Sequence, residues 1–226
     1  MSFLAFQQQH PQQRFSEQLC TYHQEQWDQV VHHRFTIELG EDCLPDTVFA
    51  RYLVQDYAFV QTLTKLIAYA IAYAPEMTSK HRLAVFLANV TSEENTYFIR
   101  SFHALNIPEA DYSNPKLSPA AQAFATQLND AAATGYAECI IALSVAEWTY
   151  RTWAHLQGTK HPERFYLREW ISIHNHATFN DFVDWLLLEM DHIGAGHPEQ
   201  HNAFSTRFGA LLDLEEAFFT AAYDEE

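Results

Sequence analysis

Long stretches of helical apolar periodicity, interrupted by few glycines and prolines, constrain the fold of this chain more than any other feature. Only 6 glycines and 8 prolines occur among 226 residues, too few for the many tight turns of an all-β protein. Over residues 46–73 apolar side chains recur at helical spacing, with Asp46 placed to cap the start and Pro75 to break the end. This segment predicts a long helix with one buried face.

One carboxylate, Asp56, interrupts that apolar helix between Leu53 and Phe59. Burying an unpaired carboxylate costs on the order of several kcal/mol, so such residues are rare in a core. This stretch alone supports two interpretations equally. Asp56 either lies on the polar flank of the helix and faces water, or faces inward as part of a site.

The same periodicity predicts an all-α fold. No segment alternates apolar and polar residues as a half-buried strand does, and the segment 136–156 is apolar on more than one face, as a central helix is. We therefore predict one domain over residues 1–226, a bundle of seven to eight helices, with residues 1–11 and 224–226 frayed. Besides 46–73, helices are expected over residues 12–38, 79–105, 119–128, 136–156, 162–174, 179–193 and 199–223.

Charge and cysteine content exclude several classes of function. The formal net charge of -16, without a basic patch, argues against binding to nucleic acid or to an anionic membrane surface. No apolar run reaches the length of a membrane span, and there is no signal-peptide pattern. Cys20, Cys43 and Cys139 are widely spaced and form no CxxC pair, so we expect neither a disulfide framework nor a zinc site, and a cytoplasmic protein.

Thirteen histidines raise the possibility of a metal centre, which we tested against the carboxylate-bridged di-iron pattern. That pattern needs Glu-x-x-His on each of two helices, and only Glu189 with His192 supplies it; Glu94 is followed by Tyr97 and Phe98 instead. We therefore expect no metal and no cofactor, and solvated or capping histidines. Gly-x-Ser-x-Gly and phosphate-binding glycine loops are also absent, and Cys139 lies in an apolar helix where burial makes a thiol inert.

Three glutamates share an aromatic setting. Each is followed one helical turn later by aromatic residues: Tyr97 and Phe98 after Glu94, Tyr150 after Glu147, and Phe218 and Phe219 after Glu215. For one helix alone, the better interpretation is a core of rings with the glutamate facing water. Its repetition on several helices favours a ring-lined pocket with inward carboxyl groups, which suits a flat, partly cationic heteroaromatic ligand.

The chain resembles the TenA family, the thiaminase II-like proteins of the haem-oxygenase-type helical fold, over most of its length. The family's Tyr-x-x-Gln-Asp signature is similar to Tyr52-Leu-Val-Gln-Asp56. Further segments fall in the family's order and approximate spacing: His33-Arg-Phe35, Gly40, Leu44-Pro45, Ser118-Pro119 to Phe124, Tyr136-Ala-Glu138, Trp148, Tyr150, Trp170-Ile171, and Glu215 with Phe218-Phe219.

The resemblance implies roles for particular residues. Asp56 would bind the amino-pyrimidine, and Glu215 would be the acid-base group. Site-lining tyrosines of the family are matched by Tyr150, while Phe59, Phe124 and His174 stand at the other lining positions. The family's catalytic cysteine corresponds to Ala146, and the Ala146-Glu147-Trp148 run is similar to the cysteine-lacking TenA_E branch, in which Glu147 would take over the role of the thiol.

The resemblance thus implies a thiamine-salvage hydrolase acting on an aminomethylpyrimidine or its N-formyl derivative. Glu147 and Glu215 would be catalytic, and Asp56, Phe59, Phe124, Tyr150 and His174 would bind the substrate. Weak classical thiaminase activity and a homodimer or homotetramer are also implied. Two other classes stay open: a di-iron or cofactor-free oxygenase on the same fold, and a non-catalytic pyrimidine-binding or regulatory protein.

Overall fold

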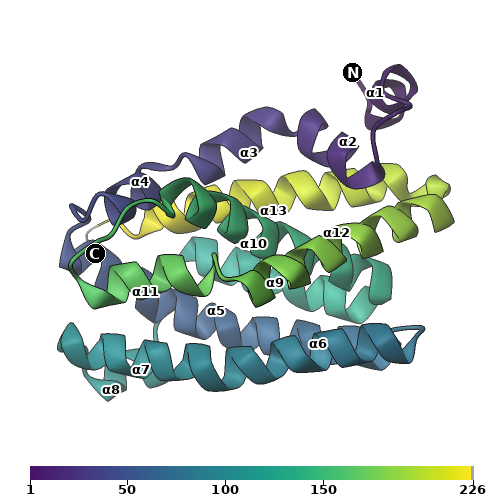
Figure 1. The fold of residues 1–226 in the computed structure, drawn as a ribbon. Helices are drawn as coiled ribbons and strands as arrows, with labels where there is room; N and C mark the ends of the chain where they lie inside the picture. The colour runs from purple at the N-terminus through teal and green to yellow at the C-terminus, as the bar shows by residue number, and fades with distance from the viewer. Residues whose placement is uncertain (225–226) are drawn as a thin grey trace.

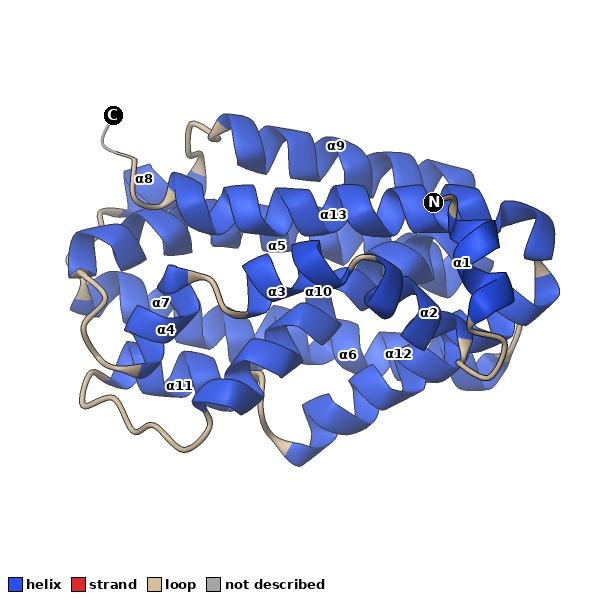
Figure 2. Cartoon of the chain, turned by 90° about the horizontal axis from the view of Figure 1, so that it is seen from above, coloured by secondary structure: helices blue, strands red, loops and turns tan. Residues whose placement is uncertain are grey.

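The structure is a computed structural model that describes residues 1–224. Within that range it contains helices and connecting loops but no strand, so the predicted all-α fold class is confirmed (Figure 2). The α-helices are α1 (Phe3–Gln9), α2 (Phe15–Tyr22), α3 (Gln24–Val31), α4 (Arg34–Gly40), α5 (Asp46–Tyr73), α6 (Met77–Asn89), α7 (Asn95–Ala104), α8 (Glu109–Ser113), α9 (Pro119–Thr134), α10 (Tyr136–Gln157), α11 (Phe165–Ile173), α12 (Ala177–Gly196) and α13 (His201–Ala221). A π-helical turn, Val90–Glu94, joins α6 to α7, and a 3-10 turn, Pro198–Gln200, precedes α13.

Helix α5 has the bounds predicted for it and answers the question that Asp56 raised. Its buried residues include Leu53, Asp56, Val60 and Leu63, which follow one another at spacings of three and four. Residues at this spacing share one face of a helix. Asp56 therefore lies on the buried face, and its side chain is 3% exposed.

Helix α10 is the centre of the bundle. It packs against α5, α9, α12 and α13, and every residue from Glu138 to Glu147 is buried. The prediction that this helix is buried on more than one side is confirmed. In Figure 1, α2 to α4 run along one side of the bundle and α6 with α7 along the opposite side.

The segment 12–38, predicted as one long helix, is instead divided into α2, α3 and α4. The first break is at His23, whose ring bonds to Ser205 Oγ of α13 at 2.9 Å. The second is at His33, whose Nδ1 accepts the Phe35 N–H at 3.1 Å and caps α4. The breaks let this segment bend along α13, and because the apolar spacing keeps its phase across them, periodicity alone did not reveal them.

Two further expectations need correction at the chain ends and near residue 110. Residues 1–11 were predicted to be frayed, but Ser2 caps α1 and Phe3 is buried. The segment between the predicted helices 79–105 and 119–128, for which no helix was expected, contains the short helix α8. Of the carboxyl end, Asp224 is exposed and outside a helix, and the expectation for 225–226 lies outside the described residues.

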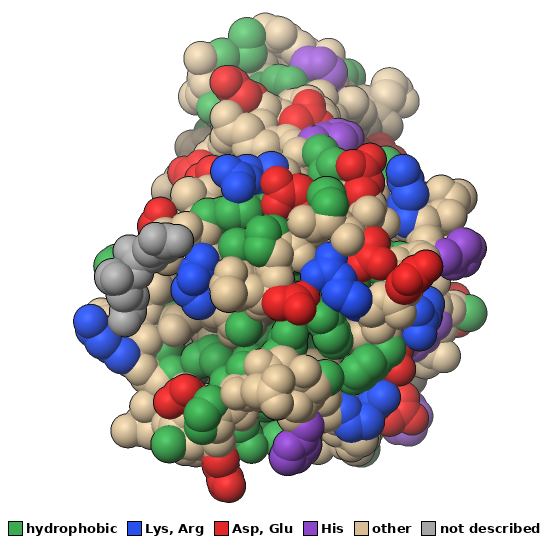
Figure 3. All heavy atoms as spheres, turned by 90° about the vertical axis from the view of Figure 1, so that its left-hand side faces the viewer, with side chains coloured by type: hydrophobic (Ala, Val, Ile, Leu, Met, Phe, Trp, Pro, Cys, Tyr) green, Lys and Arg blue, Asp and Glu red, His purple; other side chains and the backbone are tan. Residues whose placement is uncertain are grey.

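At one end of the bundle, a cluster of ion pairs connects α11 to the turn between α4 and α5. Arg164, just before α11, pairs with Asp42 and Asp46 at 2.6 Å each and also donates to the Leu44 carbonyl oxygen. These bonds fix α11 to the turn between α4 and α5. The surface at this end mixes acidic and basic side chains and shows no continuous basic area (Figure 3). Across the described residues, no helix combines the length and apolar character that a membrane crossing needs.

Two glycines of α12 test how tightly the amino-terminal helices pack on the bundle. A Cβ at Gly194 would lie 2.3 Å from Phe15 Cγ, whereas nothing lies within 4 Å of a Cβ at Gly196. Ala is favoured over Gly inside a helix by roughly 1 kcal/mol, but overpacking a rigid ring costs about 1–3 kcal/mol. We predict that Gly194→Ala lowers the free energy of unfolding by up to about 2 kcal/mol.

The matched control is Gly196→Ala, which should leave the free energy of unfolding unchanged or raise it slightly. Urea denaturation followed by circular dichroism measures both variants. Equal midpoints for the two variants would show that α2 does not press on α12 at this point.

Candidate active site

A small cavity lies inside the bundle, between α5, the π-helical turn, α10 and α11. Its volume is about 20 Å³, which is room for about one water molecule. The residues that line it are Asp56, Phe59, Val60, Leu63, Glu94, Ala146, Glu147, Tyr150, Trp170 and His174.

Most of the residues predicted to form the site come together at this cavity. Asp56, Phe59, Glu147, Tyr150 and His174 border it directly. The other two do not: Phe124 of α9 lies behind Phe59, with ring centroids 4.8 Å apart, and Glu215 of α13 is buried outside the cavity wall. Glu215 is nonetheless close enough for the charges of Asp56 and Glu147 to raise its pKa.

A pair of tyrosines connects Asp56 to α10. Tyr52, one helical turn before Asp56, shares a 2.7 Å hydrogen bond between its hydroxyl and that of Tyr150, and a hydrogen bond from Tyr52 partly offsets the rise of the Asp56 pKa. Both rings are buried. The pair fixes the two helices that carry Asp56 and Glu147 in one register.

The carboxyl groups at the cavity favour their protonated forms. Burial raises the pKa of Asp56, Glu147 and Glu215 well above the ordinary range, and the negative charges of neighbouring carboxylates add to the effect. No Lys or Arg occurs among the described residues that line the cavity. Carboxylic acids that stay protonated near neutral pH can donate a proton to a leaving group, and any one that ionises can accept a proton from water.

His174 contributes an acceptor. Its Nδ1 lies 2.9 Å from the Trp170 carbonyl oxygen, which can only accept, so Nδ1 carries the proton and Nε2 is free to accept. Burial lowers the His174 pKa to about 4, which keeps the ring neutral at pH 7. Trp170 Nε1 and Glu215 Oε1 are buried without a hydrogen-bond partner among the described residues.

Glu94 lines the cavity wall, although sequence reasoning grouped it with Glu147 and Glu215 without giving it a role in the site. It was noted for its aromatic neighbours, but nothing in the periodicity of residues 79–105 announced the π-helical turn that carries it. The hydroxyl groups of Thr91 and Ser92 bond to the Leu87 and Ala88 carbonyl oxygens at 2.8 and 2.6 Å. The adjacent Thr and Ser were the feature of the sequence that could have indicated the π-helical turn. Their hydroxyl groups can donate hydrogen bonds to backbone carbonyl oxygens where a helix widens.

The predicted exclusion of a cysteine nucleophile is supported by the position of Cys139. The thiol is buried in the apolar core, donates a weak hydrogen bond to the Ala131 carbonyl oxygen, and burial raises its pKa to about 12. Ala146, at the position that the resemblance assigns to the catalytic cysteine, borders the cavity beside Glu147. Among the described residues, no three His, Cys, Asp or Glu side chains are placed to bind one metal ion.

Comparison with known proteins bears on the family. The aminopyrimidine aminohydrolase of Bacillus subtilis is 24% identical over 94% of this chain and 91% of its own length. The hydroxymethylpyrimidine/phosphomethylpyrimidine kinase of Saccharomyces cerevisiae is 23% identical over 88% of this chain, which spans only 37% of that protein.

A solved structure of a TenA homologue from P. horikoshii superposes with a TM-score of 0.84 at 20% identity. The superposition covers 93% of this chain and 99% of the other, and it confirms the fold. The model of the TENA/THI-4/PQQC family matches residues 21–225. Because this match covers nearly the whole chain, the protein belongs to the TENA/THI-4/PQQC family.

Proposed function

We propose that this protein is a thiamine-salvage hydrolase that acts on an aminomethylpyrimidine or its N-formyl derivative. The observation that carries the proposal is the placement of Glu147 beside Ala146 on the wall of the same buried cavity as Asp56. The relatives whose names specify aminopyrimidine hydrolysis support the same substrate class.

The ring-binding residues suit an aminopyrimidine. A protonated Asp56 can donate to a ring nitrogen while its other oxygen accepts from the exocyclic amino group, and His174 Nε2 offers a second acceptor. Phe59 and Tyr150 supply flat apolar walls for the ring. Phe124, behind Phe59, acts through that ring instead of touching the substrate.

The proposed reaction needs one carboxylate and one carboxylic acid. With an aminomethylpyrimidine, the oxygen of water bonds to the methylene carbon, the carbon–nitrogen bond breaks, and the nitrogen leaves as ammonia. Glu147, as carboxylate, takes the proton of the water, and a substrate bound as ammonium already carries the proton with which its nitrogen leaves. Glu215, in its acid form outside the cavity wall, shares the proton transfer through Glu147. With the N-formyl derivative, water instead adds to the formyl carbon, and the bond between that carbon and the nitrogen breaks. Formate leaves, and the nitrogen takes up a proton and stays on the pyrimidine as the aminomethyl group.

No covalent enzyme intermediate is required in this scheme, which matches the cysteine-lacking branch of the family. Classical thiaminase activity requires displacement of the thiazolium, a step that the resemblance routes through the cysteine replaced by Ala146. We therefore expect thiamine to be cleaved far more slowly than the aminopyrimidines.

Loss of either proton-transfer carboxyl group, Glu147 or Glu215, should slow the reaction. Glu147→Gln and Glu215→Gln should each lower kcat for ammonia release from 4-amino-5-aminomethyl-2-methylpyrimidine by about 10²–10⁴-fold, because each removes a proton-transfer group. Glu216→Gln is the matched control: its side chain is 40% exposed and lies next to Glu215 in the chain. Mass spectrometry of the products measures turnover of this substrate and of the N-formyl derivative. Absence of any product from wild-type protein with both substrates would refute the proposed function.

The raised pKa values of the buried carboxyl groups should make the stability of the free protein depend on pH. A carboxyl group whose folded-state pKa is raised binds more protons folded than unfolded, so its contribution to stability is lost as pH rises from its unfolded pKa towards its folded pKa. Asp56, Glu147 and Glu215 all have raised pKa values. The free energy of unfolding should therefore decrease from pH 5 to pH 8.

Glu147→Gln and Glu215→Gln should flatten this decrease, since an amide resembles the protonated acid and does not titrate. The exposed control Glu216→Gln should keep the wild-type slope. Urea denaturation at several pH values measures the slopes, and identical slopes for all four proteins would mean that these carboxyl groups ionise normally in the fold.

A further inference from the structure

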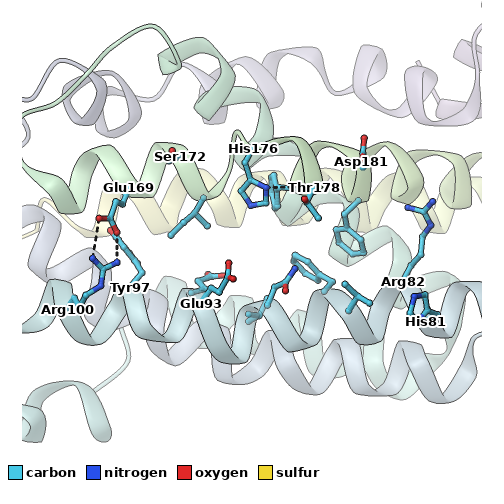
Figure 4. Close-up of a pocket in the computed structure, with 18 residues that line it drawn as sticks. His81, Arg82, Glu93, Tyr97, Arg100, Glu169, Ser172, His176, Thr178 and Asp181 are labelled. Atoms are coloured by element: carbon cyan, nitrogen blue, oxygen red, sulfur yellow. Dashed lines mark hydrogen bonds and ion pairs between the residues drawn. The ribbon is translucent and has the colours of Figure 1, made fainter.

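Glu94 separates two spaces of very different size. It lines the small cavity of about 20 Å³ that Asp56 and Glu147 border. It also lines an open groove of about 660 Å³ between α6 and α7 on one side and α11 and the start of α12 on the other. We call this second space the outer groove; Figure 4 shows the two facing walls. The cavity is far smaller than the roughly 300–1,000 Å³ of pockets for small molecules, so a ring that reaches Asp56 and Glu147 has to widen it, and the outer groove lies on the other side of Glu94.

The π-helical turn holds Glu94 in this position. Asn95, the next residue, accepts a 2.9 Å hydrogen bond from the Tyr57 hydroxyl of α5. Tyr57 directly follows Asp56, so the bond ties the Glu94 turn to the helix that carries Asp56. π-helical turns are rare, and they occur frequently at functional sites.

No cationic side chain among the described residues pairs with the Glu94 carboxyl group. No hydrogen bond or ion pair to its carboxyl group is found among the described residues. In the outer groove, Arg100 is engaged by Glu169 in a two-bond ion pair, and Arg82 and His81 lie at the opposite end of the groove (Figure 4). Around the cavity the neighbours of Glu94 are the acids Asp56 and Glu147.

Other unpartnered groups at the cavity point to a bound ligand. Glu147 is 6% exposed and has no hydrogen-bond partner in the described structure, although it lines the cavity. Trp170 lines it as well, and its buried indole N–H is unpaired. An acid cluster that lacks a protein cation and retains unpaired donors and acceptors is complementary to a cationic ligand with polar edges.

We propose that Glu94 binds the ammonium group of an aminomethylpyrimidine and so selects this cation over neutral pyrimidines of the same shape. This rests on the proposed function, which it deepens by naming the charge of the preferred substrate. Burial raises the pKa of Glu94 to about 8, so ionising it at pH 7 is disfavoured by a factor of only about ten. Of the three acids Asp56, Glu94 and Glu147, Glu94 lines both the cavity and the outer groove, so a cation that enters from the groove meets Glu94 first.

The test compares binding of two ligands that differ in charge. Calorimetry at pH 7 measures the affinities of 4-amino-5-aminomethyl-2-methylpyrimidine and of its 5-hydroxymethyl analogue, with Glu147→Gln as the background so that the amine is not consumed. We expect the background protein to prefer the amine, and adding Glu94→Gln to reduce that preference at least tenfold while the affinity for the hydroxymethyl compound changes less than threefold.

Two controls keep the result interpretable. Glu93→Gln, an exposed neighbour that lines only the outer groove, should retain the preference. Glu94→Asp, which keeps the charge, should restore part of it and shows that the loss is not caused by misfolding.

An unchanged preference in Glu94→Gln would overturn the role of Glu94 and leave the proposed function standing. Failure of the background protein and of wild-type protein to bind either pyrimidine would remove both proposals.

Discussion

The main physical constraint on this structure is that carboxyl groups are buried inside an aromatic core that offers them no basic partner. Asp56, Glu147 and Glu215 are each less than a tenth exposed, and no Lys or Arg of the described chain lines the cavity that the first two border. Folding such groups in charged form would cost several kcal/mol each, on an order-of-magnitude scale. The free protein avoids this by keeping them protonated, and a cationic ligand offers the other solution.

The helices that carry these acids are packed together and joined by a buried hydrogen bond. The acids are carried by α5, α10 and α13, helices that pack against one another, and the Tyr52–Tyr150 bond fixes α5 relative to α10. Fixed helices prevent the carboxyl groups from turning to water. The exception is the π-helical turn with Glu94, which borders the outer groove and is partly exposed, so access to the cavity is concentrated there.

Much of this arrangement could be predicted from the sequence, but not all of it. The bounds of α5 and the apolar character of α10 follow from local patterns, because spacing on one helix decides which face is buried. Whether Asp56 was buried could not be decided on its own helix, and it became clear only from the repetition of acids on other aromatic helices. The breaks at His23 and His33 depend on contacts with α13, nearly two hundred residues away in the chain, and a π-helical turn preserves the apolar pattern on both sides. Glu94 was therefore visible as a residue but not as part of the site.

The protonation state of the buried acids in the free protein is the central claim, and it can be measured directly. Carbon-13 NMR of protein labelled at the side-chain carboxyl carbons, with Glu147→Gln and Glu215→Gln used for assignment, follows each group as pH changes. We predict that the Glu147 and Glu215 resonances keep the chemical shift of a protonated acid in the free protein at pH 7. Ordinary titration of both groups near pH 4 to 5 in the free protein would contradict this account.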